Sequence, residues 1–266
     1  MDLGFEGKTV LVTGSYRGTG QAIAERFAAE GATVAVHGLE AGTAEPVADA
    51  INAAHPGRAF AVTGDITSDA GAAQLVAELN GRPIDILINN YGAADRGSWD
   101  RSETADWIRS YEINVLSAMR VTRALLPPMR ERRWGRIVFL GTIGSTAPAA
   151  RMPHYYAAKG ALHTMMVSLA KELAHTGITV NLVSPGLIRT PEVEANLRAR
   201  AAAKGWGEDW SVIEARALEE GTGSLTGHIA TPAEVASAVL YLASAQAAAI
   251  TAVNLRVDGG ATAAVT

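Results

Sequence analysis

The segment from Lys8 to Glu30, KTVLVTGSYRGTGQAIAERFAAE, joins three local patterns. Lys8–Thr13 is a nearly continuous apolar run, which is typical of a strand buried on both faces of a parallel sheet. Three glycines follow within Gly14–Gly20, and the apolar residues of Gln21–Glu30 then recur at helical spacing. Such a loop lets a phosphate approach the backbone and the unpaired N–H groups of the first helical turn. In this context the loop predicts nucleotide binding rather than an ordinary tight turn.

The same alternation of strand and helix continues along the chain. Strands are expected at Lys8–Thr13, Thr33–His37, Ala59–Thr63, Ile84–Ile88, Arg136–Leu140, Thr179–Val183 and Asn254–Val257. Helices are expected at Gln21–Glu30, Glu45–Ala54, Ala70–Leu79, Thr104–Arg132, His154–His175 and Ala233–Ala243. This order predicts an α/β fold with a doubly wound, Rossmann-like parallel sheet of about seven strands and helices on both faces. Because no linker or low-complexity tract interrupts residues 1–266, we expect a single domain.

Composition argues against several classes of protein. The 266 residues carry a net charge of -4 and have a pI near 5.9, which disfavours nucleic acid as a partner. The chain has no cysteine, so disulfides and cysteine-ligated metals are excluded, and its six histidines show no metal-ligand spacing. We therefore expect no metal site. No signal-like N-terminus and no apolar stretch of membrane-spanning length is present, so we expect a cytoplasmic protein that does not bind membranes.

A second pattern with chemical content is Tyr155-Tyr156-Ala157-Ala158-Lys159, at the start of a predicted helix. Residues four apart on a helix share a face, so the hydroxyl of Tyr155 and the ammonium of Lys159 are expected to project into the same space. A cation beside a phenol favours the phenolate, and we expect Lys159 to lower the pKa of Tyr155 from about 10. The alternative is a half-buried ring beside a solvated lysine, so the pair needs support from elsewhere in the chain.

The ends of the predicted strands provide that support. In parallel sheets, ligands bind outside the carboxyl ends of the strands. The segments that follow the predicted strands are Gly14–Gly20, His37–Glu40, Asp65–Ile66, Asn89–Gly92, Gly141–Ser145 and Pro185–Thr190. They are rich in small, hydroxyl and amide side chains. We expect them to form one polar binding crevice along this edge of the sheet.

Together these segments resemble the short-chain dehydrogenase/reductase family over nearly the whole chain. Thr13-Gly14-x-x-x-Gly18-x-Gly20 is similar to its cofactor motif, and Tyr155-x-x-x-Lys159 is similar to its catalytic motif. Four further motifs are similar to those of the family: Asp65-Ile66, Asn89-Asn90-Tyr91-Gly92, Asn114 in Ile113-Asn114-Val115, and Pro185-Gly186-x-Ile188-x-Thr190. Six motifs in the family's order indicate its ordinary, non-extended branch.

The resemblance implies an oxidoreductase that transfers a hydride between NAD(P)(H) and a small or medium apolar ketone or secondary alcohol. Tyr155 is then the general acid and base. Lys159 lowers its pKa and holds the nicotinamide ribose, and Asn114 binds a water that links Lys159 to solvent. The position of the family's catalytic serine corresponds to Thr142, which keeps the hydroxyl. Ser145 is the reserve candidate for that role.

The resemblance also implies which residues bind the cofactor. They are Gly14, Ser15, Arg17, Gly18, Thr19, Gly20, His37, Gly38, Leu39, Asp65, Ile66, Asn90, Tyr91, Gly92, Tyr155, Lys159, Pro185, Gly186, Ile188 and Thr190. Two of them depart from the family pattern. Tyr91 replaces an alanine and is expected beside the nicotinamide end, where it either narrows the substrate pocket or simply packs. Thr19 replaces the usual isoleucine, and we expect little consequence.

The choice between NADP and NAD depends on the end of the second predicted strand. Gly38 stands where NAD enzymes of the family usually have an acid, and Leu39 where NADP enzymes often have an arginine. Arg17, assisted by His37, can pair with a 2′-phosphate, whereas the carboxylate of Glu40 would repel it. The balance favours NADP slightly, with NAD as the alternative.

Two regions outside the motifs bear on the substrate and on assembly. Residues 190–229 break the alternation and are expected to form one or two helices, which the resemblance identifies as a mobile lid over the substrate. Trp206 and Trp210 in this segment either line an apolar pocket or anchor the lid. Thr104–Arg132 and His154–His175 carry more apolar surface than one sheet face needs. We therefore expect a homo-oligomer, with a tetramer favoured by the resemblance and a dimer as the alternative.

An alternative function is a nucleotide-binding regulator on the same fold with weakened catalysis. It is prompted by threonine at position 142, where the family has serine. The intact Tyr155, Lys159 and Asn114 argue against it.

Overall fold

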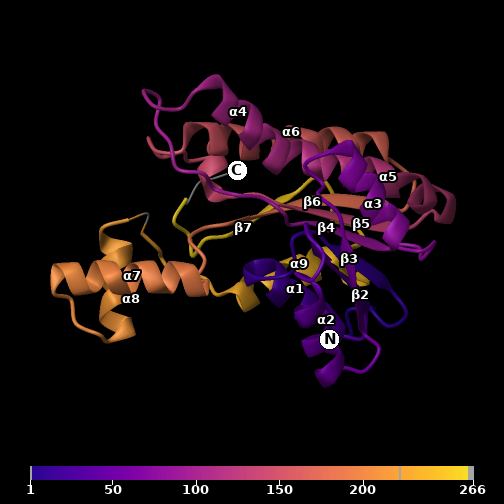
Figure 1. The fold of residues 1–266 in the computed structure, drawn as a ribbon, viewed down its shortest axis with the longest axis horizontal. Coiled ribbons are helices and arrows are strands. Elements are labelled where there is room, and N and C mark those ends of the chain that lie inside the picture. Colours follow the sequence, from indigo (N-terminus) through magenta and orange to yellow (C-terminus); the bar gives the residue numbers. More distant parts are fainter. Residues whose placement is uncertain (1, 222, 263–266) are drawn as a thin grey trace.

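The computed structural model describes residues 2–221 and 223–262, and its centre is a parallel sheet (Figure 1). Within these residues the sheet has seven strands in the order β3-β2-β1-β4-β5-β6-β7, and every neighbouring pair is parallel. The strands are β1 (Thr9–Val12), β2 (Thr33–Gly38), β3 (Ala59–Thr63), β4 (Ile86–Asn89), β5 (Gly135–Leu140), β6 (Ile178–Pro185) and β7 (Asn254–Val257). The strand order reverses at β1, so the doubly wound α/β prediction is confirmed.

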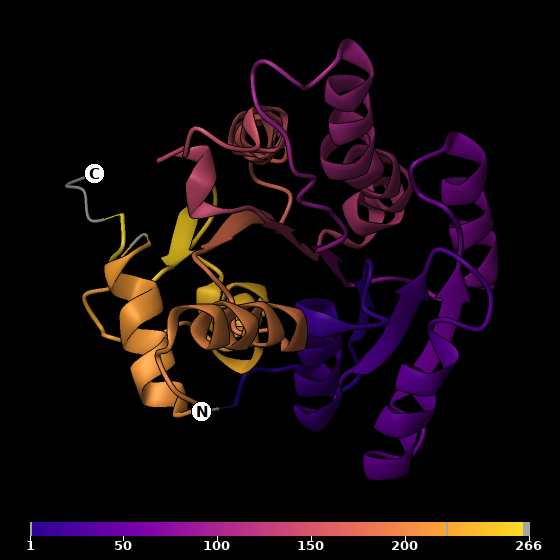
Figure 2. The same ribbon diagram turned by 60° about the vertical axis from the view of Figure 1, so that its left-hand side comes forward.

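Helices cover both faces of the sheet, as Figures 1 and 2 show from two sides. One face carries α1 (Gly18–Ala29), α2 (Glu45–Ala54) and α9 (Pro232–Ala243); the other carries α3 (Asp69–Glu78), α5 (Ser117–Arg132) and α6 (Pro153–Glu172). α4 (Thr104–Tyr111) packs beside α6. In residues 2–221 and 223–262, no helix combines the length and apolar character that a membrane span requires.

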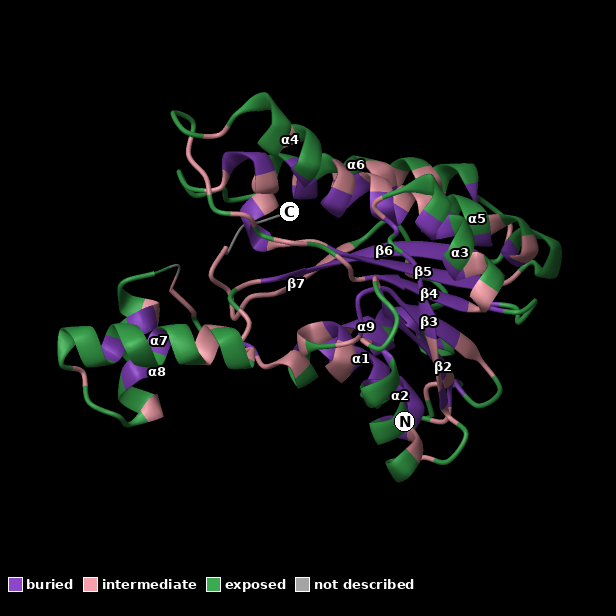
Figure 3. Cartoon of the chain, viewed as in Figure 1, coloured by how far each residue is buried: buried purple, intermediate pink, exposed green. Residues whose placement is uncertain are grey.

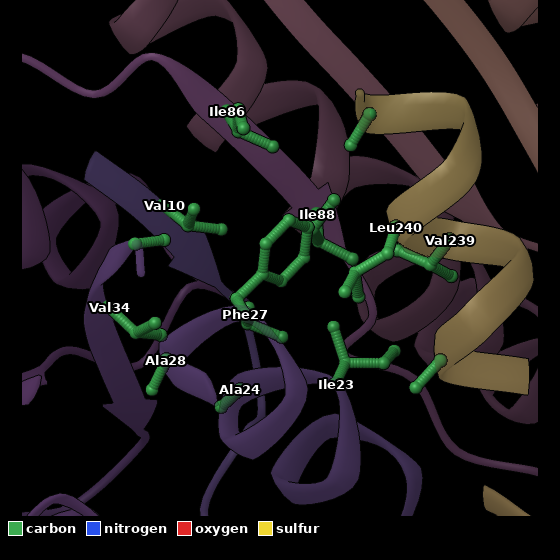
Figure 4. Packing of buried hydrophobic residues seen from close by; sticks show 14 of the residues in the cluster. Val10, Ile23, Ala24, Phe27, Ala28, Val34, Ile86, Ile88, Val239 and Leu240 are labelled. Carbon is green, nitrogen blue, oxygen red and sulfur yellow. The ribbon is translucent and has the colours of Figure 1, made fainter. Parts of the chain in front are cut away.

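Alternating side chains of each strand point to opposite faces of the sheet. Val10 and Val12 of β1 belong to the core shared with α1 and α9, whereas Leu11 between them belongs to the core on the other face. In Figure 4, Phe27 of α1 points toward Val10 and Ile88 of the sheet. Figure 3 shows that the sheet is buried on both faces and that exposed residues lie on the outer surfaces of the helices. This two-sided burial is the reason for the continuous apolar runs in the sequence.

Most elements begin and end within a few residues of their predicted bounds, but the predicted helix Thr104–Arg132 is interrupted. It consists of α4, a π-helical segment η1 (Glu112–Leu116) and α5. The interruption has a local cause, because the side-chain amide of Asn114 donates to the carbonyl oxygen of Ser110 at 3.0 Å. A side chain that takes this carbonyl competes with the backbone N–H that would otherwise bond to it. Such single-turn bulges are frequent at functional sites.

Residues 190–229 form two helices that stand apart from the sheet, at the left of Figure 1. They are α7 (Pro191–Lys204) and α8 (Trp210–Glu219), and a small apolar cluster of Leu197, Ala201, Ile213, Ala217 and Ile229 joins them. Thr190 caps α7 by accepting a hydrogen bond from the amide of Val193 at 3.3 Å. This two-helix unit therefore has its own packing, which is separate from the two main cores.

Candidate active site

A groove follows the carboxyl edge of the sheet. Its first part, a cavity of about 390 Å³, lies between the glycine loop and residues 90–93 after β4. Its second part, about 450 Å³, lies between the end of β5, the start of α6 and the loop after β6. Thr19, Asn90, Gly92 and Ala93 line both parts, so the two cavities adjoin. The groove occupies the position where the strand order reverses, which is the usual ligand site of such sheets.

Most of the predicted site residues line this groove. They are Gly14, Arg17, Gly18, Thr19, Gly20, Leu39, Asn90, Tyr91, Gly92, Tyr155, Lys159, Pro185, Gly186, Ile188 and Thr190. Ser15, His37, Gly38, Asp65, Ile66, Asn114 and Thr142 are not among the lining residues. Sequence reasoning missed the lining residues Ala93, Ala94, Leu140, Glu192 and Val193. Ala93 and Ala94 directly follow a predicted motif, and Glu192 and Val193 lie in the segment expected as a lid, although the sequence does not indicate which of its residues reach the groove.

The glycine loop leaves space for a ligand beside its backbone. Gly14 and Gly18 have φ values of 63° and 58°, in the left-handed region that glycine adopts without strain. At Gly20 a Cβ would lie 2.5 Å from both the Gly14 carbonyl oxygen and Asn90 Nδ2, so only glycine fits. α1 begins at Gly18 with no side chain capping its first N–H groups. The loop thus offers backbone donors at the positive end of a helix, which suits a phosphate.

Asn90 and Thr13 hold the glycine loop against the segment after β4. The Asn90 side chain donates to the carbonyl oxygens of Thr13 and Gly14 at 2.9 and 3.2 Å. The Thr13 hydroxyl accepts from the amides of Asn90 and Tyr91, both at 3.0 Å. Asn89, the preceding residue, donates to the hydroxyl of Thr122 in α5 at 3.0 Å. The two asparagines therefore connect the centre of the sheet to the loop and to a covering helix.

His37 is fully buried at the end of β2, and its ring is engaged on both sides. Nδ1 accepts from the amide of Gly14 at 3.0 Å, and Nε2 lies 2.9 Å from the carbonyl oxygen of Gly64. Because a carbonyl only accepts, Nε2 carries the proton and the ring is neutral. Burial lowers the pKa of His37, although nearby Glu78 and Asp65 oppose that effect. This differs from the expectation that His37 assists Arg17, because the ring holds the glycine loop instead.

Ser15 and Gly38 both adjoin His37 at the end of β2: Ser15 through a hydrogen bond and Gly38 as the next residue in the chain. Ser15 is buried, and its hydroxyl donates to the Val12 carbonyl oxygen at 2.7 Å and accepts from the His37 amide at 2.9 Å. At Gly38 a Cβ would lie only 2.0 Å from Thr43 Oγ1, so a side chain there would have to displace the Thr43 hydroxyl. Leu39 is the residue of this strand end that lines the groove.

Asp65 and Ile66 lie after β3 and outside the lining of the groove. Ile66 is fully buried in the core. Asp65 is exposed, and its carboxylate accepts from the Thr67 amide at 3.0 Å and from the Thr67 hydroxyl at 2.6 Å. In this structure the carboxylate therefore shapes its own turn.

Tyr155 meets Thr142 at the second part of the groove. The Tyr155 hydroxyl interacts with the Thr142 side chain, which lowers the pKa of Tyr155. Burial has the larger effect, and with the adjacent Tyr156 it raises the pKa of Tyr155 to about 12. Tyr155 is therefore protonated at neutral pH. The reserve hydroxyl, Ser145, points elsewhere, toward the Thr142 carbonyl oxygen at 2.6 Å and His163 Nε2 at 2.7 Å.

Lys159 is buried one helical turn beyond Tyr155. Its ammonium donates to the carbonyl oxygen of Leu140, the last residue of β5, at 2.8 Å. Burial lowers the pKa of Lys159 to about 8. The expectation that Lys159 lowers the pKa of Tyr155 is not met in this structure, because burial of the phenol outweighs other effects and the ammonium is directed at the strand.

Asn114 and Lys159 flank the same glycine. A Cβ on Gly92 would lie 2.6 Å from Asn114 Oδ1 and 2.9 Å from Lys159 Nζ. The Asn114 amide also accepts from the Ala93 amide at 3.1 Å and donates to the Ala93 carbonyl oxygen at 3.0 Å. The π-helical segment thus brings a buried polar side chain behind Gly92, close to Lys159.

Comparison with known proteins assigns the chain to a family. The model of the short chain dehydrogenase family matches residues 8–201, which is more than half of the chain. The chain belongs to the short-chain dehydrogenase/reductase family. As a member, it is an NAD(P)-dependent oxidoreductase.

Relatives match this dehydrogenase along its whole length. It is 35% identical over 269 residues to the uncharacterized oxidoreductase YvaG of Bacillus subtilis (strain 168), covering 98% of each protein. It is 33% identical over 261 residues to the 3-oxoacyl-(acyl-carrier-protein) reductase FabG of Escherichia coli (strain K12), covering 97% of this chain and 98% of the relative. The structure of L-sorbose reductase from Gluconobacter frateurii complexed with NADPH and L-sorbose has a TM-score of 0.91 at 30% identity, covering 100% of both chains.

Tyr91 lies in the first part of the dehydrogenase groove. Its side chain contacts the glycine loop, because a Cβ on Gly14 would meet it at 3.1 Å. It lines the first part of the groove together with Arg17 and Leu39, and it does not line the part that contains Tyr155. Of the two expected roles, narrowing the substrate pocket or packing, these contacts favour packing. The direction of the side chain from the loop after β4 decides this, and a motif match does not report that direction.

The tryptophans of residues 190–229 pack within the two-helix unit. The Trp210 ring lies under the guanidinium of Arg189, 4.0 Å from the ring centroid. Trp206 lies beside Lys204, whose Nζ is 5.2 Å from the ring centroid. Both rings pack against the apolar cluster of α7 and α8, and neither lines the groove. The rings therefore do not line the pocket, and their contacts hold the two helices together rather than anchoring the lid to the body of the protein. Glu192 at the start of α7 lies 3.8 Å from Arg17 of the glycine loop.

The buried neutral His37 predicts a specific loss of stability in acid. Its pKa in the folded state lies below its ordinary value of 6.5, so its contribution is present above pH 6.5 and is lost as pH falls below that value. The free energy of unfolding, measured by urea titration between pH 7.5 and about 5, should fall more steeply in the wild type than in His37→Asn, whose amide oxygen replaces Nδ1.

His175→Asn is the matched control, because His175 is exposed and has a left-handed φ of 64° that asparagine tolerates. This variant should keep the wild-type pH dependence. Parallel curves for the wild type and His37→Asn would contradict the assignment of a neutral His37.

Proposed function

We propose that the chain reduces a small or medium-sized apolar ketone, and oxidises the corresponding secondary alcohol, with NADP(H) as cofactor and Tyr155 as general acid and base. The observation that carries this proposal is the hydroxyl pair of Tyr155 and Thr142 beside a groove that continues to the glycine loop. One end of the groove has the donors that a phosphate requires, and the other has a proton donor.

The residues of the first part of the groove fit a dinucleotide. An uncapped helix start, two glycines in left-handed conformations and a third that leaves no space for a Cβ make a cradle for a pyrophosphate. Asn90 and His37 would keep this cradle in shape. Lys159 and the Pro185–Thr190 loop would hold the nicotinamide ribose. When bound, the dinucleotide supplies or accepts the hydride.

Each of the four residues near the second part of the groove would have a distinct role. Tyr155, protonated at neutral pH, would donate its proton to the carbonyl oxygen during reduction. The Thr142 hydroxyl would hydrogen-bond the same oxygen and hold it against the phenol. Lys159, with a pKa of about 8, would return a proton to the phenolate that Tyr155 becomes after reduction. Asn114 would bind the water that connects Lys159 to solvent, since both side chains flank Gly92.

The lining of the groove supports an apolar substrate. Around Tyr155 the walls are formed by Ala93, Ala94, Leu187, Ile188 and Val193, and their side chains offer no hydrogen-bond partner. The segment 190–229 would act as the lid, because α7 contributes Glu192 and Val193 to the groove. Cytoplasmic location remains a prediction from the sequence.

NADP is favoured over NAD by three observations at the groove. Arg17 is exposed at its edge and lines it, so its guanidinium can pair with a 2′-phosphate. Position 38 is a glycine crowded by the Thr43 hydroxyl, so the acid that would bind ribose hydroxyls is missing there. Glu40, the carboxylate expected to repel a phosphate, does not line the groove. A related structure, the L-sorbose reductase, was determined with NADPH.

The chain would assemble through α5 and α6. Between these helices lies an apolar hollow of about 730 Å³, lined in part by Val115, Met119, Leu126, Met165 and Leu169. A second copy of the same helices would cover this surface in a symmetric dimer. A homotetramer, expected from the family resemblance, would need a further interface.

Tyr155→Phe should lower kcat for ketone reduction at least about a hundredfold and leave the Kd for NADPH nearly unchanged, because it removes only the proton donor. Thr142→Ala should lower kcat by about tenfold to a hundredfold, and Ser145→Ala by less, since Ser145 does not face Tyr155. Steady-state kinetics with a panel of apolar ketones, together with cofactor titration by fluorescence, tests both. Retained turnover in Tyr155→Phe would move the acid/base role to another residue.

Arg17→Ala should raise the Kd for NADPH about tenfold and change the Kd for NADH little, since only NADPH has the 2′-phosphate. The measurement is fluorescence titration of both cofactors with the wild type and the variant. Arg26→Ala, in the last turn of α1, is the control and should change neither value. Equal weakening of both cofactors would show that Arg17 acts on a part that they share.

Met165→Glu should convert the oligomer to a smaller species, because it places a charge in the apolar hollow between α5 and α6. Light scattering coupled to size-exclusion chromatography measures the mass. Leu225→Glu is the control, because Leu225 is already 80% exposed. A monomeric wild type, or an unchanged mass of Met165→Glu, would exclude this surface as an interface.

A further inference from the structure

One face of α6 contacts the end of β5 and the 3-10 segment η2 (Ile143–Ser145) at three successive turns. Tyr155 interacts with the Thr142 side chain, and Lys159 donates to the Leu140 carbonyl oxygen at 2.8 Å. Four residues later, His163 Nε2 lies 2.7 Å from the hydroxyl of Ser145. The first two contacts belong to the proposed mechanism, whereas the third has no role in it.

The third contact continues to Thr142. The Ser145 hydroxyl lies 2.6 Å from the carbonyl oxygen of Thr142, to which it can only donate. Its own proton is then committed, so it accepts from His163, and Nε2 of His163 carries a proton. The direction of the chain is therefore from His163 to Ser145 to the Thr142 carbonyl. Burial lowers the pKa of the half-buried His163, but the neutral Nε2–H form and the charged form both donate this bond.

The Thr142 carbonyl is linked to the orientation of the Thr142 hydroxyl. The same carbonyl accepts the Ser145 amide at 3.1 Å, so the first turn of η2 closes on it. The Thr142 hydroxyl, as cap of this turn, accepts from the Gly144 amide at 3.2 Å. Threonine is branched at Cβ and has few side-chain rotamers, so its backbone orientation largely decides where the hydroxyl points. A Cβ at Gly144 would lie 2.0 Å from the Tyr156 ring, so α6 also packs closely on this turn.

We propose that His163 and Ser145 form a positioning pair that holds the η2 turn so that the Thr142 hydroxyl faces Tyr155 and the substrate oxygen. This inference rests on the proposed function, because it assigns a further determinant of the same reaction. Neither residue touches the substrate. They act on the rate through the orientation of Thr142, and they leave the cofactor end of the groove unchanged.

The chain offers a matched pair of substitutions at position 163. In His163→Gln the amide nitrogen takes a place close to that of Nε2 and can still donate to Ser145. In His163→Asn the shorter amide reaches only as far as Nδ1 and loses the bond. Ser145→Ala removes the middle of the chain, and the double variant Ser145→Ala with His163→Asn tests whether the two act as one unit.

The measurements are kcat and KM for a ketone substrate, the Kd for NADPH, and the thermal unfolding midpoint of each variant. We expect His163→Asn and Ser145→Ala each to lower kcat about five- to tenfold, the size of one lost hydrogen bond. The double variant should be no slower than the singles. His163→Gln should stay within about twofold of the wild type. The Kd for NADPH should remain unchanged, and the unfolding midpoint should fall by no more than the few degrees that one lost hydrogen bond causes.

An unchanged kcat in His163→Asn, a His163→Gln variant as slow as His163→Asn, or additive losses in the double variant would overturn the pair. If His163→Asn does not fold, Ser145→Ala and His163→Gln still decide between these outcomes. A long-range ¹H–¹⁵N spectrum of the wild type, which needs no turnover, should show His163 protonated at Nε2; a proton on Nδ1 alone would also overturn the proposal. If the wild type reduces no ketone with either cofactor, the proposed function fails, and the role of the pair fails with it.

Discussion

A buried hydrogen bond between Lys159 and Leu140 is the constraint on which the site depends. An ammonium taken out of water without partners is costly, and here it donates to the carbonyl oxygen that ends β5, at 2.8 Å. This bond fixes how far α6 lies along the sheet, and therefore where Tyr155, one turn earlier, meets Thr142. The same burial brings the pKa of Lys159 to about 8. The side chain that aligns the helix is thus itself able to exchange a proton near neutral pH.

The parts of the fold that local patterns encode could be predicted from the sequence. Strands buried on both faces are mostly apolar, so β1 and β4 are recognisable as nearly continuous runs. The spacing of Tyr155 and Lys159 follows from the pitch of a helix, and both line the groove. Likewise, Gly20 can be read from the sequence because it completes the glycine pattern after β1, and part of the reason lies within the loop, where the Gly14 carbonyl oxygen leaves no space for a Cβ.

What could not be predicted depends on how distant segments meet. Both ring nitrogens of His37 are hydrogen-bonded to backbone groups, of Gly14 and of Gly64. The sequence of β2 does not indicate these contacts, so from the sequence alone the ring is expected to be available for a ligand. Burial raises the pKa of Tyr155, and the spacing of residues in the sequence does not report burial. The sequence therefore predicts the wrong direction for this pKa shift. Glu192 reaches the groove only because α7 stands beside the glycine loop. In each case tertiary contacts, rather than the residue's own neighbours in sequence, decide the chemistry.

The crowding at Gly38 constrains the evolution of this chain. A side chain of any size at position 38 would collide with Thr43, whose hydroxyl is hydrogen-bonded to the Glu40 carbonyl oxygen at 2.6 Å. An acid at position 38 would therefore require Thr43 to rotate or to be replaced, and either change removes this hydrogen bond from the turn that follows β2. The two positions are thus coupled. A lineage that changes its cofactor by this route gives up a contact of the turn, whereas substitutions at the exposed Arg17 leave that contact intact.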